Sequence, residues 1–387
     1  MDFTFSEEQL AVGEAAAGVF AGLVDPDRVV AVERTEDRID RDLWAALAAA
    51  DLLGLAVPVD HGGGGLGLTE LCLLLEAQGG CVAPVPLWAT LVLGALPLAR
   101  FGPAELAGRW LPGVVAGDTF LTAALSGTTA SVSGQPVVVA EPDAGGWRLT
   151  GSEPAVPQAH LAARILVPAR TTGGDVLLVL VDPAGEGVAL VRATTTNREV
   201  HPHLHLSGAP VGADQVVAGP TGGPDGGAEA LRWTLEAAWT GLAALAVGVG
   251  ESALRQTAAY LNQRHQFERP LSAFQGTMLR AADAAIDIEA MRVTLWQAAW
   301  RIDTGRPASE AVAVAKWQAA ERGQRVVHAT QHLHGGMGAD ITYPIHRYFL
   351  WGKQIELMLG GPSNQLARLG RQIAARFTAR AAERVAG

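Results

Sequence analysis

The C-terminal part of the chain, from Gly226 onward, consists almost entirely of long segments with apolar residues at helical spacing. Each such segment must bury one apolar stripe, and packing several helices side by side meets this need. Glycine and proline residues separate the segments and mark short turns. The sequence therefore predicts a helical bundle, with helices over residues 251–262, 278–304, 309–335 and 365–385.

The N-terminal part, up to about Leu121, also has helical patterns but is interrupted by a glycine-rich loop at residues 58–67. Ser6 suits the N-cap of the first helix, because a serine hydroxyl can accept a hydrogen bond from a free backbone N–H. Further helices are expected over residues 42–50, 69–78 and 89–101.

Residues 122–217 have a different sequence pattern, with short runs of β-forming residues separated by Gly, Pro and Asp. This spacing is typical of a small β-barrel or sandwich. The clearest strands are expected at residues 137–140, 147–150, 164–167 and 176–181. The expected fold class is a mostly helical α+β protein with three domains: an N-terminal helical domain (1–121), a middle β domain (122–218) and a C-terminal four-helix bundle (226–387), with residues 219–227 as a linker.

The composition excludes several classes of function. The formal net charge is −10 and no compact run of Lys and Arg occurs, which argues against nucleic-acid binding. The most apolar stretch, Leu235 to Gly250, is interrupted by Glu236, so we expect no membrane span. The acidic N-terminus is unlike a signal peptide. Because only Cys72 and Cys81 are present, neither a disulfide framework nor a zinc site is expected, and we predict a cytoplasmic protein without a metal.

Several motifs in a fixed order carry the functional information. Gln331 begins the run Gln-His-Leu-His-Gly-Gly-Met-Gly, which ends at Gly338 and is followed by Tyr343-Pro344 and by the segment 357–361, Leu-Met-Leu-Gly-Gly. Upstream, residues 264–271 read Arg-His-Gln-Phe-Glu-Arg-Pro-Leu and precede Phe274-Gln275. Together with Ser-Glu-Glu-Gln at residues 6–9, Leu-Gly-Leu-Ala-Val-Pro at 53–58 and Trp-Leu-Pro at 110–112, these motifs resemble the acyl-CoA dehydrogenases over nearly the whole chain.

The resemblance implies FAD as the cofactor and an acyl-CoA thioester as the substrate. In this family each flavin lies at a subunit interface, and the neighbouring subunit holds its adenosine-diphosphate part. The residues for that role are present here. Arg264 would pair with the pyrophosphate, Phe267 would pack on the cofactor, Gln275 and Gln331 would supply amide hydrogen bonds, and Gly335, Gly336 and Gly338 would let backbone N–H groups come close.

The residues that would serve this chain's own flavin are missing. Counting from Tyr343-Pro344 places Leu359 where the family has its catalytic Glu, and leucine cannot abstract a proton. Ala155 and Pro157 stand where the family has the Trp and Thr that contact the flavin ring. Residues 124–130 also lack the family's acidic residue.

This asymmetry indicates a subunit that completes the flavin site of a partner. The chain resembles a subunit of the actinobacterial heteromeric (α₂β₂) dehydrogenases that act on CoA esters of steroid side chains. The partner would be a homologous subunit that carries the catalytic Glu. Two alternatives remain open: a homomeric enzyme with a displaced base, for which Glu236 and Glu356 are the candidates, and a non-enzymatic acyl-CoA-binding scaffold.

The run His-Pro-His-Leu-His at residues 201–205 has the composition of a metal site. It has no Cys, Asp or Glu at ligand spacing, so we interpret it as a solvated loop.

Overall fold

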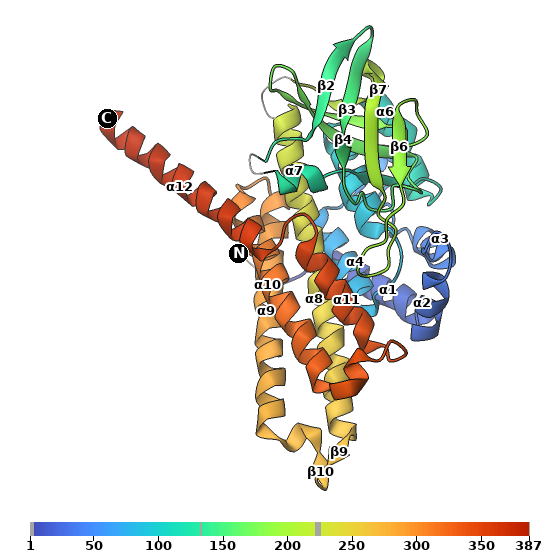
Figure 1. The fold of residues 1–387 in the computed structure, drawn as a ribbon, viewed down its shortest axis with the longest axis vertical. Helices are drawn as coiled ribbons and strands as arrows, with labels where there is room; N and C mark the ends of the chain where they lie inside the picture. Colours follow the sequence, from blue (N-terminus) through green and yellow to red (C-terminus); the bar gives the residue numbers. More distant parts are fainter. Residues whose placement is uncertain (1–3, 132–133, 221–225, 387) are drawn as a thin grey trace.

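A computed structural model describes residues 4–131, 134–220 and 226–386. Residues 1–3, 387 and part of the expected linker (221–225) lie outside the described residues. Helices occupy both ends of the chain and a sheet lies between them in sequence, as predicted (Figure 1). The N-terminal helices are α1 (Glu7–Leu23), α2 (Pro26–Glu33), α3 (Arg41–Ala49), α4 (Leu68–Cys81), α5 (Leu96–Phe101) and α6 (Ala104–Val115), with a π-helical segment η2 (Trp88–Ala95) before α5.

The start of α1 is determined locally, as the sequence predicted. The Ser6 hydroxyl accepts a hydrogen bond from the Gln9 backbone N–H at 3.2 Å, and the Gln9 side-chain oxygen accepts one from the Ser6 N–H at 3.0 Å. This reciprocal pair satisfies two of the donors that every helix N-terminus leaves free. Asp25 and Asp40 cap α2 and α3 in the same way.

The middle part forms one mixed sheet in the order β6-β7-β3-β2-β4-β5-β8. The four predicted strand runs correspond to β2 to β5. Strands β1 and β2 both pair in parallel with β4, at its two halves, and the remaining pairs are antiparallel. The strands are β1 (Leu121–Ala123), β2 (Val138–Asp143), β3 (Gly146–Glu153), β4 (Arg164–Thr171), β5 (Val176–Val181), β6 (Val188–Val191), β7 (His203–Gly212) and β8 (Val216–Ala218), and a short helix α7 (Ser126–Ala130) follows β1.

The C-terminal helices differ from the prediction in two respects. First, the apolar run from Leu235 to Gly250 and the helix expected at residues 251–262 are parts of one continuous helix, α8, which begins at Gly227. Second, the sequence pattern missed α11, which packs against α8 and α10, whereas the last helix, α12, projects from the body (Figure 1). The helices are α8 (Gly227–Gln263), α9 (Gln275–Asp303), α10 (Ser309–Leu333), α11 (Ile345–Leu357) and α12 (Pro362–Ala386), with a small hairpin of β9 (His265–Gln266) and β10 (Arg269–Pro270) between α8 and α9.

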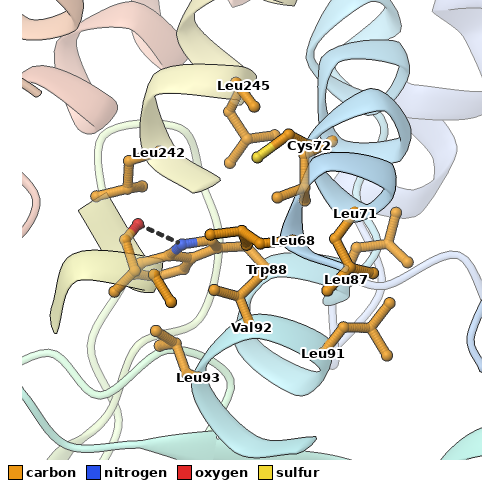
Figure 2. Packing of buried hydrophobic residues seen from close by; sticks show 14 of the residues in the cluster. Leu68, Leu71, Cys72, Leu87, Trp88, Leu91, Val92, Leu93, Leu242 and Leu245 are labelled. Atoms are coloured by element: carbon orange, nitrogen blue, oxygen red, sulfur yellow. Dashed lines mark hydrogen bonds between the residues drawn. The ribbon is translucent and has the colours of Figure 1, made fainter. Parts of the chain in front are cut away.

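The main core joins the N-terminal helices to α8, and the sheet has a second cluster of its own. Trp88 lies in the main core among leucines of α4, η2 and α8, and its indole N–H donates to the Ala238 carbonyl at 3.0 Å (Figure 2). Among the described helices, α8 alone is long and apolar enough to cross a membrane, and 89% of its apolar window is buried inside the protein, as in a core helix.

Candidate functional site

The motif around Arg264 lies at the end of α8, on the β9–β10 hairpin and the start of α9 (Figure 1). Arg264 and Gln275 are exposed, and the Phe267 side chain is 87% exposed. Phe267 also has a positive φ of 53°, a conformation that costs energy for a bulky residue. A fully exposed aromatic ring on a strained turn is typical of a residue that contacts a ligand or another chain.

The glycine turn lies against the same end of α8. His334 lies in this motif, directly before Gly335 in the sequence. Its ring stacks on the Tyr260 ring at 4.4 Å, and its Nε2 lies 3.2 Å from the Thr257 hydroxyl. Tyr260 and Thr257 belong to the last turns of α8, just before Arg264. The structure therefore brings the two motifs together, although about seventy residues separate them in the sequence.

The geometry of the turn explains its glycines. Gly335 has φ +61°, and a Cβ on Gly338 would come within 2.3 Å of the Gln331 carbonyl oxygen. The Gln331 side-chain oxygen is buried and has no hydrogen-bond partner among the described residues. A buried amide oxygen without a partner is costly, so it is available to a donor from outside the chain.

Leu359 lies far from this cluster, in the turn between α11 and α12. It is 7% exposed with φ +52°, and its carbonyl oxygen accepts hydrogen bonds from Trp239 Nε1 at 2.9 Å and Gln365 Nε2 at 3.3 Å. Trp239 lies on the first half of α8, whereas Arg264 follows its last residue. At 1.5 Å per residue, the two positions are roughly 35–40 Å apart along the helix axis.

A cavity of about 340 Å³ adjoins Leu359. It lies between η2, the middle sheet and the α11–α12 turn. Ala155 and Pro157 also line it, so the structure gathers these three residues at one cavity. Its wall comprises Trp88, Leu93, Ala123, Leu125, Ser126, Thr129, Ala130, Pro154, Ala155, Pro157, His201, Gln354, Leu357, Met358, Leu359, Gly360, Gly361 and Asn364, and this set of described residues contains no Asp or Glu.

The two carboxylates considered as displaced bases lie elsewhere. Glu236 is 2% exposed, within α8 and beyond its first turn, where it accepts hydrogen bonds from Arg232 at 2.7 Å and from the Ser309 hydroxyl. Glu356 is ion-paired with Lys353 on α11. Neither side chain lines the cavity, and each carboxylate already has a cationic partner.

Three buried ionisable side chains were not singled out by the sequence. Burial raises the pKa of Glu153, at the end of β3, to about 7, while a hydrogen bond from the Gly127 N–H partly offsets this. Burial lowers the pKa of Lys316, on α10, to about 7, and that of His334 to about 4. Lys316 Nζ donates to the carbonyls of Ile355 and Glu356 at the end of α11, just before Leu359. A lone lysine in the otherwise apolar run 311–317 was the one available sequence signal.

The interpretation of the histidine run as a solvated loop is wrong at its first residue. His201 is 1% exposed and lines the cavity, and His203 and His205 belong to β7. Residues distant in the sequence surround His201, among them Trp88 and Met358, and the short-range pattern could not predict this. In the described part of the chain, no three or more His, Cys, Asp or Glu side chains are grouped so that they could hold a metal ion.

Known proteins resemble this chain in sequence and in structure. Residues 6–118 match the N-terminal domain of acyl-CoA dehydrogenases and residues 225–374 match their C-terminal domain. Acyl-CoA dehydrogenase FadE27 of Mycobacterium tuberculosis is 38% identical over 97% of this chain and 99% of its own length, and FadE28 of the same organism is 33% identical over 96% and 98%.

Two solved structures are similar over almost the whole chain. A variant of the Tcur3481–Tcur3483 steroid ACAD has 47% identity and a TM-score of 0.89, covering 96% of this chain and 99% of the other. A chain of the ChsE4–ChsE5 complex from Mycobacterium tuberculosis has 39% identity and a TM-score of 0.90, covering 97% and 99%. The chain therefore belongs to the acyl-CoA dehydrogenase family.

Proposed function

We propose that this chain is a subunit of a heteromeric, FAD-dependent acyl-CoA dehydrogenase, in which it completes the flavin site of a partner subunit. The observation that carries the proposal is the separation of two half-sites along α8. The residues suited to hold a dinucleotide are exposed at one end of the bundle, whereas the cavity beside Leu359, nearer the other end, has no carboxylate among its described lining residues.

The exposed half fits FAD. Arg264 presents a guanidinium that can donate two parallel hydrogen bonds to phosphate oxygens. Phe267 offers an uncovered ring, Gln275 and the unpartnered Gln331 oxygen offer amide hydrogen bonds, and the turn at Gly335, Gly336 and Gly338 lets backbone N–H groups approach a phosphate.

The half beside Leu359 does not fit the flavin ring. Ala155 has no aromatic face, and Pro157 has neither a hydroxyl nor a backbone N–H to donate. FAD, when bound, accepts a hydride from the β-carbon of the acyl group, and a carboxylate must take the α-proton. We infer that the partner supplies both this carboxylate and the ring pocket.

Two similar chains support the choice of partner and substrate class. One belongs to a steroid ACAD and the other to a two-protein complex. We propose a homologous dehydrogenase carrying the catalytic Glu as the partner, in an α₂β₂ assembly, and a steroid side-chain CoA ester as the substrate. A cytoplasmic location stays a prediction.

The alternatives are less well supported. A homomeric enzyme needs a free carboxylate at the cavity, and Glu236 and Glu356 are both held in ion pairs outside it. A scaffold without flavin has no use for the exposed Arg264 beside a glycine turn.

The test is the flavin content of this chain purified alone and purified with a homologous partner that carries the Glu. We expect no stoichiometric FAD on the lone chain and one FAD per pair of chains in the complex. Replacing Arg264 by Met should lower the occupancy in the complex, whereas Arg34→Met, at an exposed position on the N-terminal domain, should not. One FAD per lone chain, together with acyl-CoA-dependent dye reduction, would falsify the proposal.

A further inference from the structure

His201 is a buried imidazole at the cavity that neither half of the flavin site uses. Its Nε2 lies 3.2 Å from the Glu199 carboxylate, which also accepts a hydrogen bond from the Asn197 amide at 2.9 Å. Gln158 Nε2 is 3.5 Å from the same ring nitrogen. Because the Gln158 amide nitrogen can only donate, the contact that orients a ring protonated on Nε2 is the one with Glu199, in the loop before β7.

The contact with Glu199 determines what the other ring nitrogen can do. An ionised carboxylate only accepts hydrogen bonds, so the proton of a neutral His201 belongs on Nε2. Nδ1 then carries a lone pair, and no residue in the described ranges makes a hydrogen bond to it. A histidine oriented in this way by a carboxylate is a fixed hydrogen-bond acceptor.

The rest of the cavity is suited to an apolar body. Its lining residues include the large apolar side chains of Trp88, Leu93, Leu125, Leu357 and Met358. An apolar cavity of about 150 Å³ can hold benzene, so this cavity of about 340 Å³ has room for a molecule of about two rings. Small-molecule sites commonly combine apolar walls with one or two placed polar groups.

We propose that the cavity beside Leu359 is a non-redox binding site for a small apolar molecule with a hydroxyl group, whose O–H donates to Nδ1 of His201. This site requires neither FAD nor a partner chain, so it does not depend on the proposed function. The cavity would then bind a ligand of its own, although it lacks the catalytic carboxylate and the residues that would contact a flavin ring.

The test compares 2-naphthol, which can donate a hydrogen bond, with 2-methoxynaphthalene, which can only accept one. Binding to the full-length chain is measured by calorimetry and repeated on the complex with the partner. Because one neutral hydrogen bond contributes about 1 kcal/mol, we expect 2-naphthol to bind roughly five-fold more tightly.

Three variants isolate the role of the imidazole. His201→Phe keeps an aromatic ring in the wall and should bind both ligands equally. Because one Glu199 oxygen faces both the Asn197 amide N–H and Nε2 of His201, the second variant combines Asn197→Asp with Glu199→Gln. An acceptor then replaces the Asn197 donor, so the new amide at position 199 can donate to Nε2, which moves the ring proton to Nδ1. This variant should reverse the preference in favour of 2-methoxynaphthalene. The matched control is His205→Phe, since His205 is exposed and pairs with Ser152; it should keep the wild-type preference.

Absence of binding, equal affinities in the wild type, or an unchanged preference in both His201→Phe and the Asn197→Asp, Glu199→Gln double variant would overturn the proposal. Circular dichroism establishes that each variant is folded. Since both substitutions of the double variant are nearly isosteric, it keeps the test decisive even if His201→Phe does not fold.

Discussion

Glu153 and His334 are each at most 2% exposed, and burial shifts their pKa values in opposite directions. Burial disfavours the charged form, so the carboxyl group holds its proton more tightly in the folded state and the imidazole holds its proton less tightly. A pKa that differs between the folded and unfolded states makes the free energy of unfolding depend on pH. The two residues therefore predict pH dependences of opposite sign for the free energy of unfolding.

For Glu153 the pKa is about 7 in the folded protein, whereas its ordinary value is 4.5. Its contribution to stability is fully present below pH 4.5 and is lost as the pH rises to 7 and beyond, by about 3 kcal/mol. Glu153→Gln keeps an acceptor for the Gly127 N–H but cannot ionise. Denaturant unfolding at pH 5 and pH 8 should show the variant gaining stability relative to wild type at the higher pH. An identical slope in both proteins would refute this assignment.

For His334 the pKa is about 4 in the folded protein, whereas its ordinary value is 6.5. The folded state binds this proton less tightly, so stability falls as the pH drops from 6.5 to 4. In His334→Phe the ring can still stack on Tyr260, and the acid-side slope from this position should disappear. Thermal unfolding between pH 4 and pH 7 measures the difference. If wild type and variant lose stability in parallel, another group is responsible.

At the scale of elements, α4 and α8 approach each other through glycine. A Cβ on Gly248 would lie 1.9 Å from the Glu76 carbonyl oxygen, and one on Gly79 would lie 2.3 Å from the Leu245 carbonyl oxygen. These contacts are between backbones, so the helices could not accommodate a side chain without moving apart. The close approach fixes α8 against the N-terminal domain. It thereby helps to position Trp239, whose indole N–H donates to the Leu359 carbonyl.

We expect Gly248→Ala to destabilise the protein by about 3 kcal/mol, because the overpacked contact is rigid backbone. The matched control is Gly250→Ala, on the same helix, whose added Cβ would meet flexible side-chain atoms no closer than 3.4 Å. That substitution should be near neutral, because helix propensity favours Ala over Gly. The midpoints of denaturant unfolding test both. Equal midpoints for the two variants would show that α4 and α8 can separate at low cost.

At the scale of the whole molecule, the half-sites depend on different parts of the fold. The dinucleotide-binding half uses the distal ends of α8 and α10. The cavity half uses the sheet, η2 and the α11–α12 turn. Restoring one residue in one half therefore cannot restore the reaction.

Leu359→Glu tests this argument. The lone variant should show no acyl-CoA-dependent dye reduction, because Ala155 and Pro157 still cannot hold the flavin ring. It should also be less stable than wild type at pH 8, since the cavity wall offers the new carboxylate no cationic partner among the described residues. Dye reduction and thermal unfolding are the two measurements. Activity in the lone variant would mean that the missing base was the chain's only defect.

Local chemistry determined much of this protein from the sequence alone. Apolar periodicity predicted the helix, sheet, helix order, Ser6 identified the start of α1, and the motif residues identified the family to which the chain belongs. These features depend on neighbours a few residues apart, which a sequence displays directly. The prediction missed α11, because this helix has only 13 residues and polar side chains such as His346, Arg347 and Glu356 interrupt its apolar positions.

Only the tertiary structure decided the environment of the buried polar groups. His201 was expected in solvent but is buried, Glu236 pairs with Arg232 and Ser309, and Lys316 caps α11 from α10. The contacts of Glu236 with Ser309 and of Lys316 with α11 join positions dozens of residues apart, and the cover over His201 likewise comes from other segments. Ionisation depends on burial and on the nearest charges, and folding determines both. Sequence motifs can therefore name the residues of a site, but their chemistry is set by what the fold places around them.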